Sequence, residues 1–158
     1  MKNALALSLA LALAPLSAAA QQAPAPYGTP VSLEQARQIV TTARQAAGAR
    51  DFTMAFAVVE PSGQLVLFEK MDGTQYGSVV VAQEKARSAA FFKRPTKALS
   101  DAVAAGRVAV LGLPGAVPIE GGVPIVLNGR ILGALGISGG TSEQDGEIAA
   151  AALSGFPK

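Results

Sequence analysis

The 158-residue sequence contains no cysteine, no histidine and no tryptophan. These absences exclude disulfides, zinc sites built from thiolate and imidazole, a Ser-His-Asp triad, a cysteine nucleophile and a histidine ligand to a cofactor metal. Charge is also scarce: 15% of the residues are charged, and 13 basic against 11 acidic side chains give a formal net charge of +2. Such a balanced charge argues against nucleic acid as a partner. Half of the residues are apolar, which is typical of one globular domain.

The first twenty residues have the features of a secretory signal peptide. Lys2 supplies the positive charge, residues 4–14 are apolar except for Ser8, and three alanines at 18–20 form a small-residue cleavage site. The apolar stretch is shorter than the roughly 20 residues that span a bilayer. We therefore expect cleavage after Ala20 and a periplasmic or secreted protein without stable membrane insertion; an uncleaved N-terminal anchor is the alternative.

The remaining chain predicts a single domain over residues 32–158, preceded by a flexible lead-in over residues 21–31. The lead-in contains three prolines and little that can pack. Ser32 and Gln35 match a capping box, which predicts that a helix begins there, and Gly48 is a suitable end.

Two hairpins and three further helices complete the predicted order of elements. Apolar runs at 52–60 and 64–71 flank a Pro-Ser-Gly turn, and the runs at 123–127 and 130–138 flank an Asn-Gly turn, which is the strongest short hairpin signal. Helices are predicted over 78–93, over 96–105 and from 141 or 142 to just before 155, while 108–113 fits a strand or a loop. The order helix, hairpin, helices, hairpin, helix predicts an α+β domain with helices packed on a central antiparallel sheet.

The segment 85–97 is the most unusual part of the chain, because it has five cations, two adjacent phenylalanines and no acidic residue. One interpretation is the wall of a ligand pocket, in which Phe91 and Phe92 contact a flat ligand and the cations bind its carboxylates. The other is an amphipathic helix with its rings in the core and its charges in solvent.

The pattern of two glycines at 139–140 followed by acidic residues indicates a structural role for this segment. A tight turn with a helix N-cap explains residues 139–142, although an anion site at the helix N-terminus is the alternative. Glu143, Asp145 and Glu147 fit a solvated acidic helix start, with a weak site for a hard cation as the alternative.

Few side chains of this chain are able to bind a cofactor metal. The candidates are oxygen ligands, Tyr27, Tyr76, Met54 and Met71. Met1 is a further candidate, but it would be removed with the signal peptide. The two methionines fall in predicted strands, where they fit core positions, and Tyr76 follows a hairpin in an exposed position.

Three stretches carry a resemblance to a known family. They are Glu-Lys-Ala-Arg-Ser-Ala-Ala-Phe-Phe at 84–92 with Thr96, Gly-Gly-Val-Pro-Ile at 121–125, and Gly-Ala-Leu-Gly-Ile-Ser-Gly at 133–139 followed by Asp145. On these motifs the chain resembles the HbpS/GlcG-like family, small α+β proteins described as haem-binding or haem-degrading. The resemblance extends over residues 33–153.

This resemblance implies a profilin-like fold, assembly into homo-oligomers, and haem or a related small molecule as ligand. We expect the ligand to contact Lys85, Arg87, Phe92, Thr96, Gly121, Gly122 and Ser138. Because histidine is absent, a hydroxyl of Thr96 or Tyr76 would ligate the iron. Otherwise haem would lie unligated against the phenylalanines, with Lys85 and Arg87 near its propionates.

Three functions follow from these observations. The first is an exported small-ligand-binding protein with haem as its ligand. The second is an enzyme that degrades haem or acts on a small hydroxy- or oxo-acid, for which no acid/base pair is visible and no catalytic residue is assigned. The third is a homo-oligomeric module that binds a partner or assists a sensory system.

Overall fold

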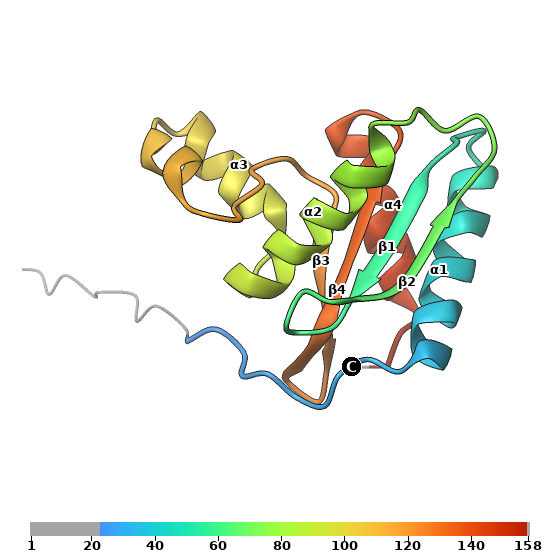
Figure 1. The fold of residues 1–158 in the computed structure, drawn as a ribbon, viewed down its shortest axis with the longest axis horizontal. Coiled ribbons are helices and arrows are strands. Elements are labelled where there is room, and N and C mark those ends of the chain that lie inside the picture. Colours follow the sequence, from blue (N-terminus) through green and yellow to red (C-terminus); the bar gives the residue numbers. More distant parts are fainter. Residues whose placement is uncertain (1–22, 158) are drawn as a thin grey trace, which may run out of the picture.

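The computed structural model describes residues 23–157, so the predicted signal peptide over residues 1–20 lies outside the described residues. In chain order the elements are α1 (Leu33–Gly48), β1 (Ala55–Val59), β2 (Leu65–Lys70), α2 (Ser78–Phe92), α3 (Thr96–Ala104), the 3₁₀ helix η1 (Val108–Gly112), β3 (Gly122–Leu127), β4 (Arg130–Ser138) and α4 (Ser142–Ser154). This order confirms the predicted α+β class and both hairpins (Figure 1). None of the described helices has the length and apolar character needed to cross a membrane.

The four strands form one antiparallel sheet in the order β2-β1-β4-β3. The central strands β1 and β4 are buried along almost their whole length. Burial on both faces explains why these two segments are continuous apolar runs in the sequence rather than alternating polar and apolar residues.

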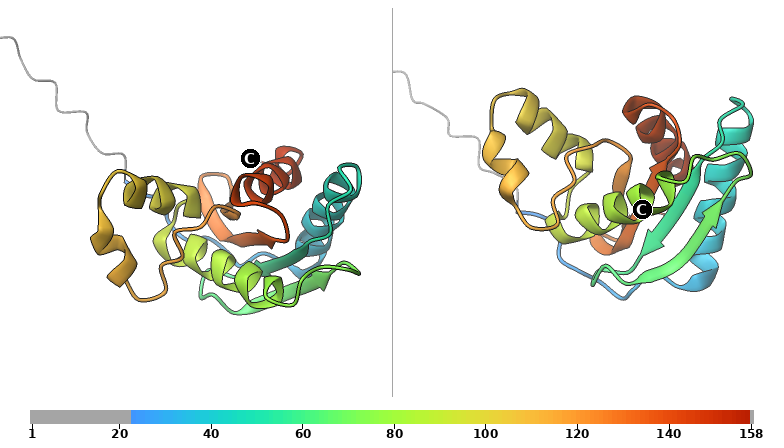
Figure 2. Two further views of the ribbon diagram at one scale, coloured as in Figure 1. Left: turned by 90° about the horizontal axis from the view of Figure 1, so that it is seen from above. Right: turned by 45° about the horizontal axis from the view of Figure 1, so that its top comes forward.

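Helices cover both faces of the sheet (Figure 2). On one face α2 packs through small side chains, namely Ala82, Ala86, Ala89 and Ala90 against Ala55, Ala57 and Ala134. On the other face, α1 and α4 pack against the sheet through larger side chains. Ile39 of α1 and Ile148 of α4 share a core cluster with Phe56, Leu135 and Ile137 of the sheet. The alanine layer brings the backbone of α2 close to β4, and this close approach positions the side chains at the end of the sheet.

Residues 26–31 form an extended segment, here called the strap, that lies against β4. The backbone amide of Gly28 donates to the carbonyl of Ile131 at 2.9 Å, and the amide of Ile131 donates to the carbonyl of Pro26 at 2.9 Å. Pairing between β1 and β4 ends where Val59 faces Ala134, so the part of β4 before Ala134 is free to pair with the strap. The predicted flexible lead-in is therefore fixed to the sheet from Pro26 onward.

Residues 96–121, here called the arm, leave the body between α2 and β3 and contain α3 and η1. Figures 1 and 2 show the arm projecting away from the sheet. No residue of η1 is buried, and the side chains of Val108 and Leu111 are 65% and 61% exposed. The segment predicted as a strand or loop is thus a short 3₁₀ helix on a projecting part of the chain. Its returning limb is attached to α2, because the amide of Val117 donates to Ser88 Oγ at 3.0 Å.

Candidate functional site

Four of the seven predicted site residues meet where the arm joins the sheet. Lys85 lies on α2, Thr96 begins α3, and Gly121 and Gly122 lead into β3. A Cβ atom at residue 122 would overlap the Lys85 carbonyl group and lie 2.7 Å from Thr96 Cγ2, and one at residue 121 would lie 2.9 Å from Lys85 Nζ. These residues, with Asp145, are called the clasp below.

A buried ion pair between Lys85 and Asp145 forms the centre of the clasp. The distance from Lys85 Nζ to Asp145 Oδ2 is 2.6 Å, and the two residues are 1% and 2% exposed. Lys85 Nζ also donates to the carbonyl of Ile137 at 3.2 Å, while the amide of Ile137 donates to the Gly121 carbonyl. The ammonium group therefore lies at the sheet edge beside β3, and it joins α2 on one face to α4 on the other.

Asp145 differs from its prediction as part of a solvated acidic helix start. Glu143 and Glu147 are exposed, but Asp145 is buried because Lys85 reaches it from the opposite face. Burial raises the pKa of the Asp145 carboxyl above its ordinary value, while Lys85 and the amides of Gly140 and Gly139 offset part of that rise. The pKa of Glu143 is instead lowered by hydrogen bonds from its own backbone amide and from Thr141.

The hydroxyl groups around the clasp are engaged within the chain. Thr96 Oγ1 accepts a hydrogen bond from the amide of Gly122 at 3.0 Å, and Ser138 Oγ donates to Ser78 Oγ at 3.0 Å. Over residues 23–157, no buried side-chain nitrogen or oxygen lacks a hydrogen-bond partner. The side chains of the clasp are therefore held by hydrogen bonds within the chain, and the Thr96 hydroxyl is engaged with the backbone at the start of β3.

The other predicted residues lie outside the clasp. Arg87 pairs with Glu84 and donates from Nε to the carbonyl of Gly63 at 3.2 Å, and Phe92 is half-buried at the end of α2. Phe91 is half-exposed, and its ring lies beside Gly63 and Gly115. The segment thus combines parts of both interpretations, because one cation is buried and one aromatic ring faces solvent.

The three motif stretches of the sequence converge on the clasp. The first supplies Lys85 and Thr96, the second supplies the two glycines, and the third supplies the Ile137 carbonyl and ends shortly before Asp145. The family model described as "Haem degrading protein HbpS-like" matches residues 31–154. The chain belongs to the HbpS-like family.

Individual relatives agree with this assignment. The chain is 35% identical to Protein GlcG of Escherichia coli (strain K12) over 108 residues, which cover 68% of this chain and 81% of GlcG. The crystal structure of Klebsiella pneumoniae protein ORFY has a TM-score of 0.72 and 28% identity, and the match covers 89% of this chain and 96% of ORFY. A crystal structure of a PduOC–haem complex has the same TM-score and identity, with 80% and 94% coverage. The predicted resemblance is confirmed. In this chain, the three HbpS-like motifs meet at the clasp, where their residues pack against one another.

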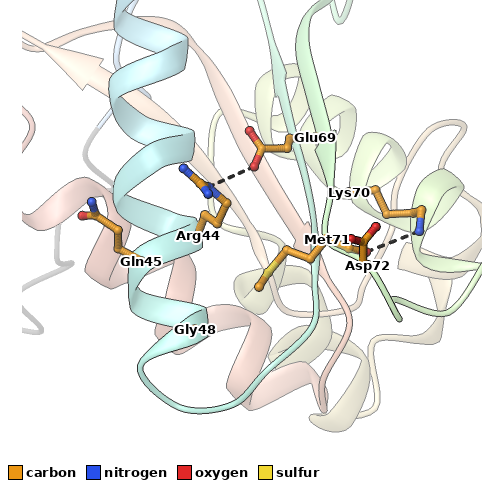
Figure 3. Close-up of a pocket in the computed structure, with 7 residues that line it drawn as sticks. All are labelled: Arg44, Gln45, Gly48, Glu69, Lys70, Met71 and Asp72. Atoms are coloured by element: carbon orange, nitrogen blue, oxygen red, sulfur yellow. Dashed lines mark hydrogen bonds and ion pairs between the residues drawn. The ribbon is translucent and has the colours of Figure 1, made fainter.

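A hollow that no sequence pattern indicated lies between α1 and the end of β2 (Figure 3). It has a volume of about 670 Å³ and is lined by Arg44, Gln45, Gly48, Glu69, Lys70, Met71 and Asp72. Arg44 Nε lies 3.1 Å from Glu69 Oε1 across it. None of the seven predicted residues lines this hollow, and its residues come from two elements without a shared motif. Within the described residues, no group of three or more acidic side chains is placed to hold a metal ion.

Proposed function

We propose that this chain is an exported small-ligand-binding protein and that its ligand is haem. The observation that carries the proposal is membership of a family described as haem degrading. The similarity to PduOC, whose structure was solved with haem, supports the same ligand. When bound, haem would supply a redox-active iron, while the residues of this chain bind and orient it.

The residues that fit haem lie on the surface near the C-terminal end of α2. At the clasp, the two glycine positions are in close contact with Lys85 and Thr96. Phe91 presents a half-exposed ring, and Lys93 and Arg94 follow it in the sequence. An apolar ring beside cations suits a flat ligand with carboxylate groups.

Titration of residues 21–158 with hemin is expected to shift the Soret band with saturation at a fixed stoichiometry. The Phe91→Ala variant should bind about fivefold more weakly, because burial of half a phenylalanine side chain contributes about 1 kcal/mol. Val80→Ala is the matched control, since Val80 is an exposed apolar residue at the other end of α2. An unshifted Soret band at saturating hemin contradicts the proposal.

The family description also favours haem degradation as a second candidate function. Addition of ascorbate in air to the hemin-loaded protein separates the two functions. A stable Soret band indicates binding alone, whereas progressive bleaching that requires the protein indicates an enzyme.

Export and assembly belong to the same proposal. Export to the periplasm or the medium is supported by the signal-peptide pattern of residues 1–20. Assembly of copies of this chain is supported by the arm, where η1 has no buried residue and Val108, Leu111 and Leu113 are exposed. A 3₁₀ helix has weak hydrogen-bond geometry, so contact with a second copy would stabilise it.

Native mass spectrometry of the protein recovered from expressing cells is expected to give a subunit of residues 21–158 within a homo-oligomer. Leu111→Glu should shift the distribution toward the monomer, because it places a charge in the apolar surface of the arm. Val80→Glu, an equally exposed substitution on α2, serves as the control. A monomeric unaltered protein contradicts assembly, and a subunit that keeps residues 1–20 contradicts cleavage.

A further inference from the structure

Another hollow, here called the strap hollow, lies where the strap passes the start of α1 and the β3–β4 hairpin. Its volume of about 500 Å³ is within the range of small-molecule pockets. The strap supplies residues 28–30 of the lining, α1 supplies Ser32 and Gln35, and the hairpin supplies four residues. In Figure 1 the blue strap passes beside the turn of this hairpin before it enters α1. Neither Phe91 nor any of the seven predicted site residues lines this hollow.

Part of the lining is apolar and is fixed by the core. Leu132 is 6% exposed and belongs to the core cluster between the sheet and α1, and the half-buried Leu127 packs against that cluster. Pro30 of the strap adds a further apolar group. Such a lining binds the hydrocarbon part of a ligand by removing its surface from water.

Arg130 is the one charged residue of the lining, and it forms no ion pair within residues 23–157. Its stem lies against Gly28, where a Cβ atom would be 2.9 Å from Arg130 Cβ and 3.5 Å from Arg130 Cδ. Its Nη1 group donates to the carbonyl of Tyr27 at 3.3 Å. These two contacts hold the guanidinium group beside the hollow. Its remaining N–H groups can bind a carboxylate, whose two oxygens match the guanidinium fork.

The surroundings of Arg130 differ from those of the arginine in the hollow between α1 and β2. There Arg44 is paired with Glu69, and Asp72 adds a second carboxylate to the lining. The lining of the strap hollow contains no acidic residue. Gln35 Oε1 accepts a hydrogen bond from the amide of Ser32, which leaves the Nε2 group of Gln35 as a further donor. The strap hollow therefore suits an anion.

We propose that the strap hollow binds a small monocarboxylate with an apolar body, such as an aryl-substituted or branched-chain alkanoic acid. Arg130 binds the carboxylate, and Leu127 and Leu132 contact the hydrocarbon part. Because the strap forms one side of the hollow, a bound ligand also joins the strap to the sheet. This site goes beyond the proposed function and does not require haem.

Titrations of residues 21–158 with two matched probes, followed by saturation-transfer difference NMR, test the chemistry of the site. Phenylacetate should bind about tenfold more tightly than phenylacetamide, which has the same shape without the charge, since a hydrogen bond between charged groups contributes a factor of that order. Acetate, which lacks the ring, should not displace phenylacetate at equal concentration.

Two arginine variants test the location of the site. Arg130→Gln should bind phenylacetate and phenylacetamide with nearly equal affinity. Arg44→Gln, which changes the arginine of the other hollow, should keep the preference for phenylacetate. The ratio of the two affinities separates contact with the carboxylate from a structural effect, because a loosened strap would weaken both probes alike.

Hydrogen exchange of the strap tests the link between the ligand and the strap. The amides of Gly28 and Val31 donate to the carbonyls of Ile131 and Leu132 at 2.9 and 2.8 Å. With phenylacetate at about ten times its Kd, exchange of these two amides should slow by about tenfold, since the ligand binds only while the strap is in place.

The outcomes are distinct from those of the hemin titration. The proposal is overturned if phenylacetate shows no saturable binding, if the unaltered chain binds both probes equally, or if Arg130→Gln keeps the preference for phenylacetate. Unchanged exchange of the strap amides at saturating phenylacetate shows that the ligand binds elsewhere, and this result overturns the proposal too. Hemin binding tests the proposed function separately, because none of these measurements contains haem.

Discussion

Replacement of Lys85 by methionine is expected to destabilise the folded chain by about 4 kcal/mol, because it leaves Asp145 as an uncompensated charge in the interior. Methionine matches most of the length of the lysine stem, so the main loss is the ammonium group and its two partners, Asp145 Oδ2 and the Ile137 carbonyl. Urea unfolding followed by circular dichroism measures the change in free energy of unfolding.

Two further variants make this result specific to the buried pair. The Lys85→Met/Asp145→Leu double variant should recover most of the lost stability, because replacing both charges removes the cost of an unpaired one. Lys97→Met breaks an ion pair with Asp101 in which both side chains are exposed, so it should leave the unfolding curve nearly unchanged. Equal effects of Lys85→Met and Lys97→Met would show that the clasp does not stabilise the fold.

The Gly122→Ala substitution is expected to cost about 3 kcal/mol or more, as severe overpacking of an interior does. The new methyl group would overlap the Lys85 carbonyl group and approach Thr96 Cγ2 to 2.7 Å. The Lys85 carbonyl belongs to the backbone of α2, so it cannot move aside without displacing the helix. Differential scanning calorimetry should show a much lower unfolding temperature.

Gly48→Ala is the matched control for this substitution. Gly48 is the last residue of α1, and a Cβ atom there meets nothing within 4 Å. Alanine has the higher helix propensity, so this variant should unfold at the same or a slightly higher temperature. A Gly122→Ala protein as stable as Gly48→Ala would mean that α2 and β3 are not in close contact.

The elements that the sequence predicted well are those set by local chemistry. Ser32 and Gln35 form the expected capping box at the start of α1. Asn128 and Gly129 adopt positive φ values of 50° and 70°, which a tight hairpin between twisted strands requires. The η1 helix was missed because the Gly- and Pro-interrupted segment around it has no periodic pattern.

The candidate site was predicted only in part, because burial depends on residues far away in the sequence. Lys85 stands among five cations, and nothing local distinguishes it from those that face solvent. Its burial is decided by Asp145, which lies 60 positions later on the opposite side of the sheet. The resemblance identified the residues that meet, but the structure shows them packed together. Ligand contact by the seven predicted residues stays a prediction.

The arm begins and ends at the same hydrogen bond, between the Thr96 hydroxyl and the amide of Gly122. Its two ends are therefore held together by the body, whatever lies between them. The entropy of closing such a loop changes only slowly with its length. The 24 residues at 97–120, which leave out Gly121 of the clasp, can thus change in length at little entropic cost to the sheet, so that new surfaces can evolve on a constant domain.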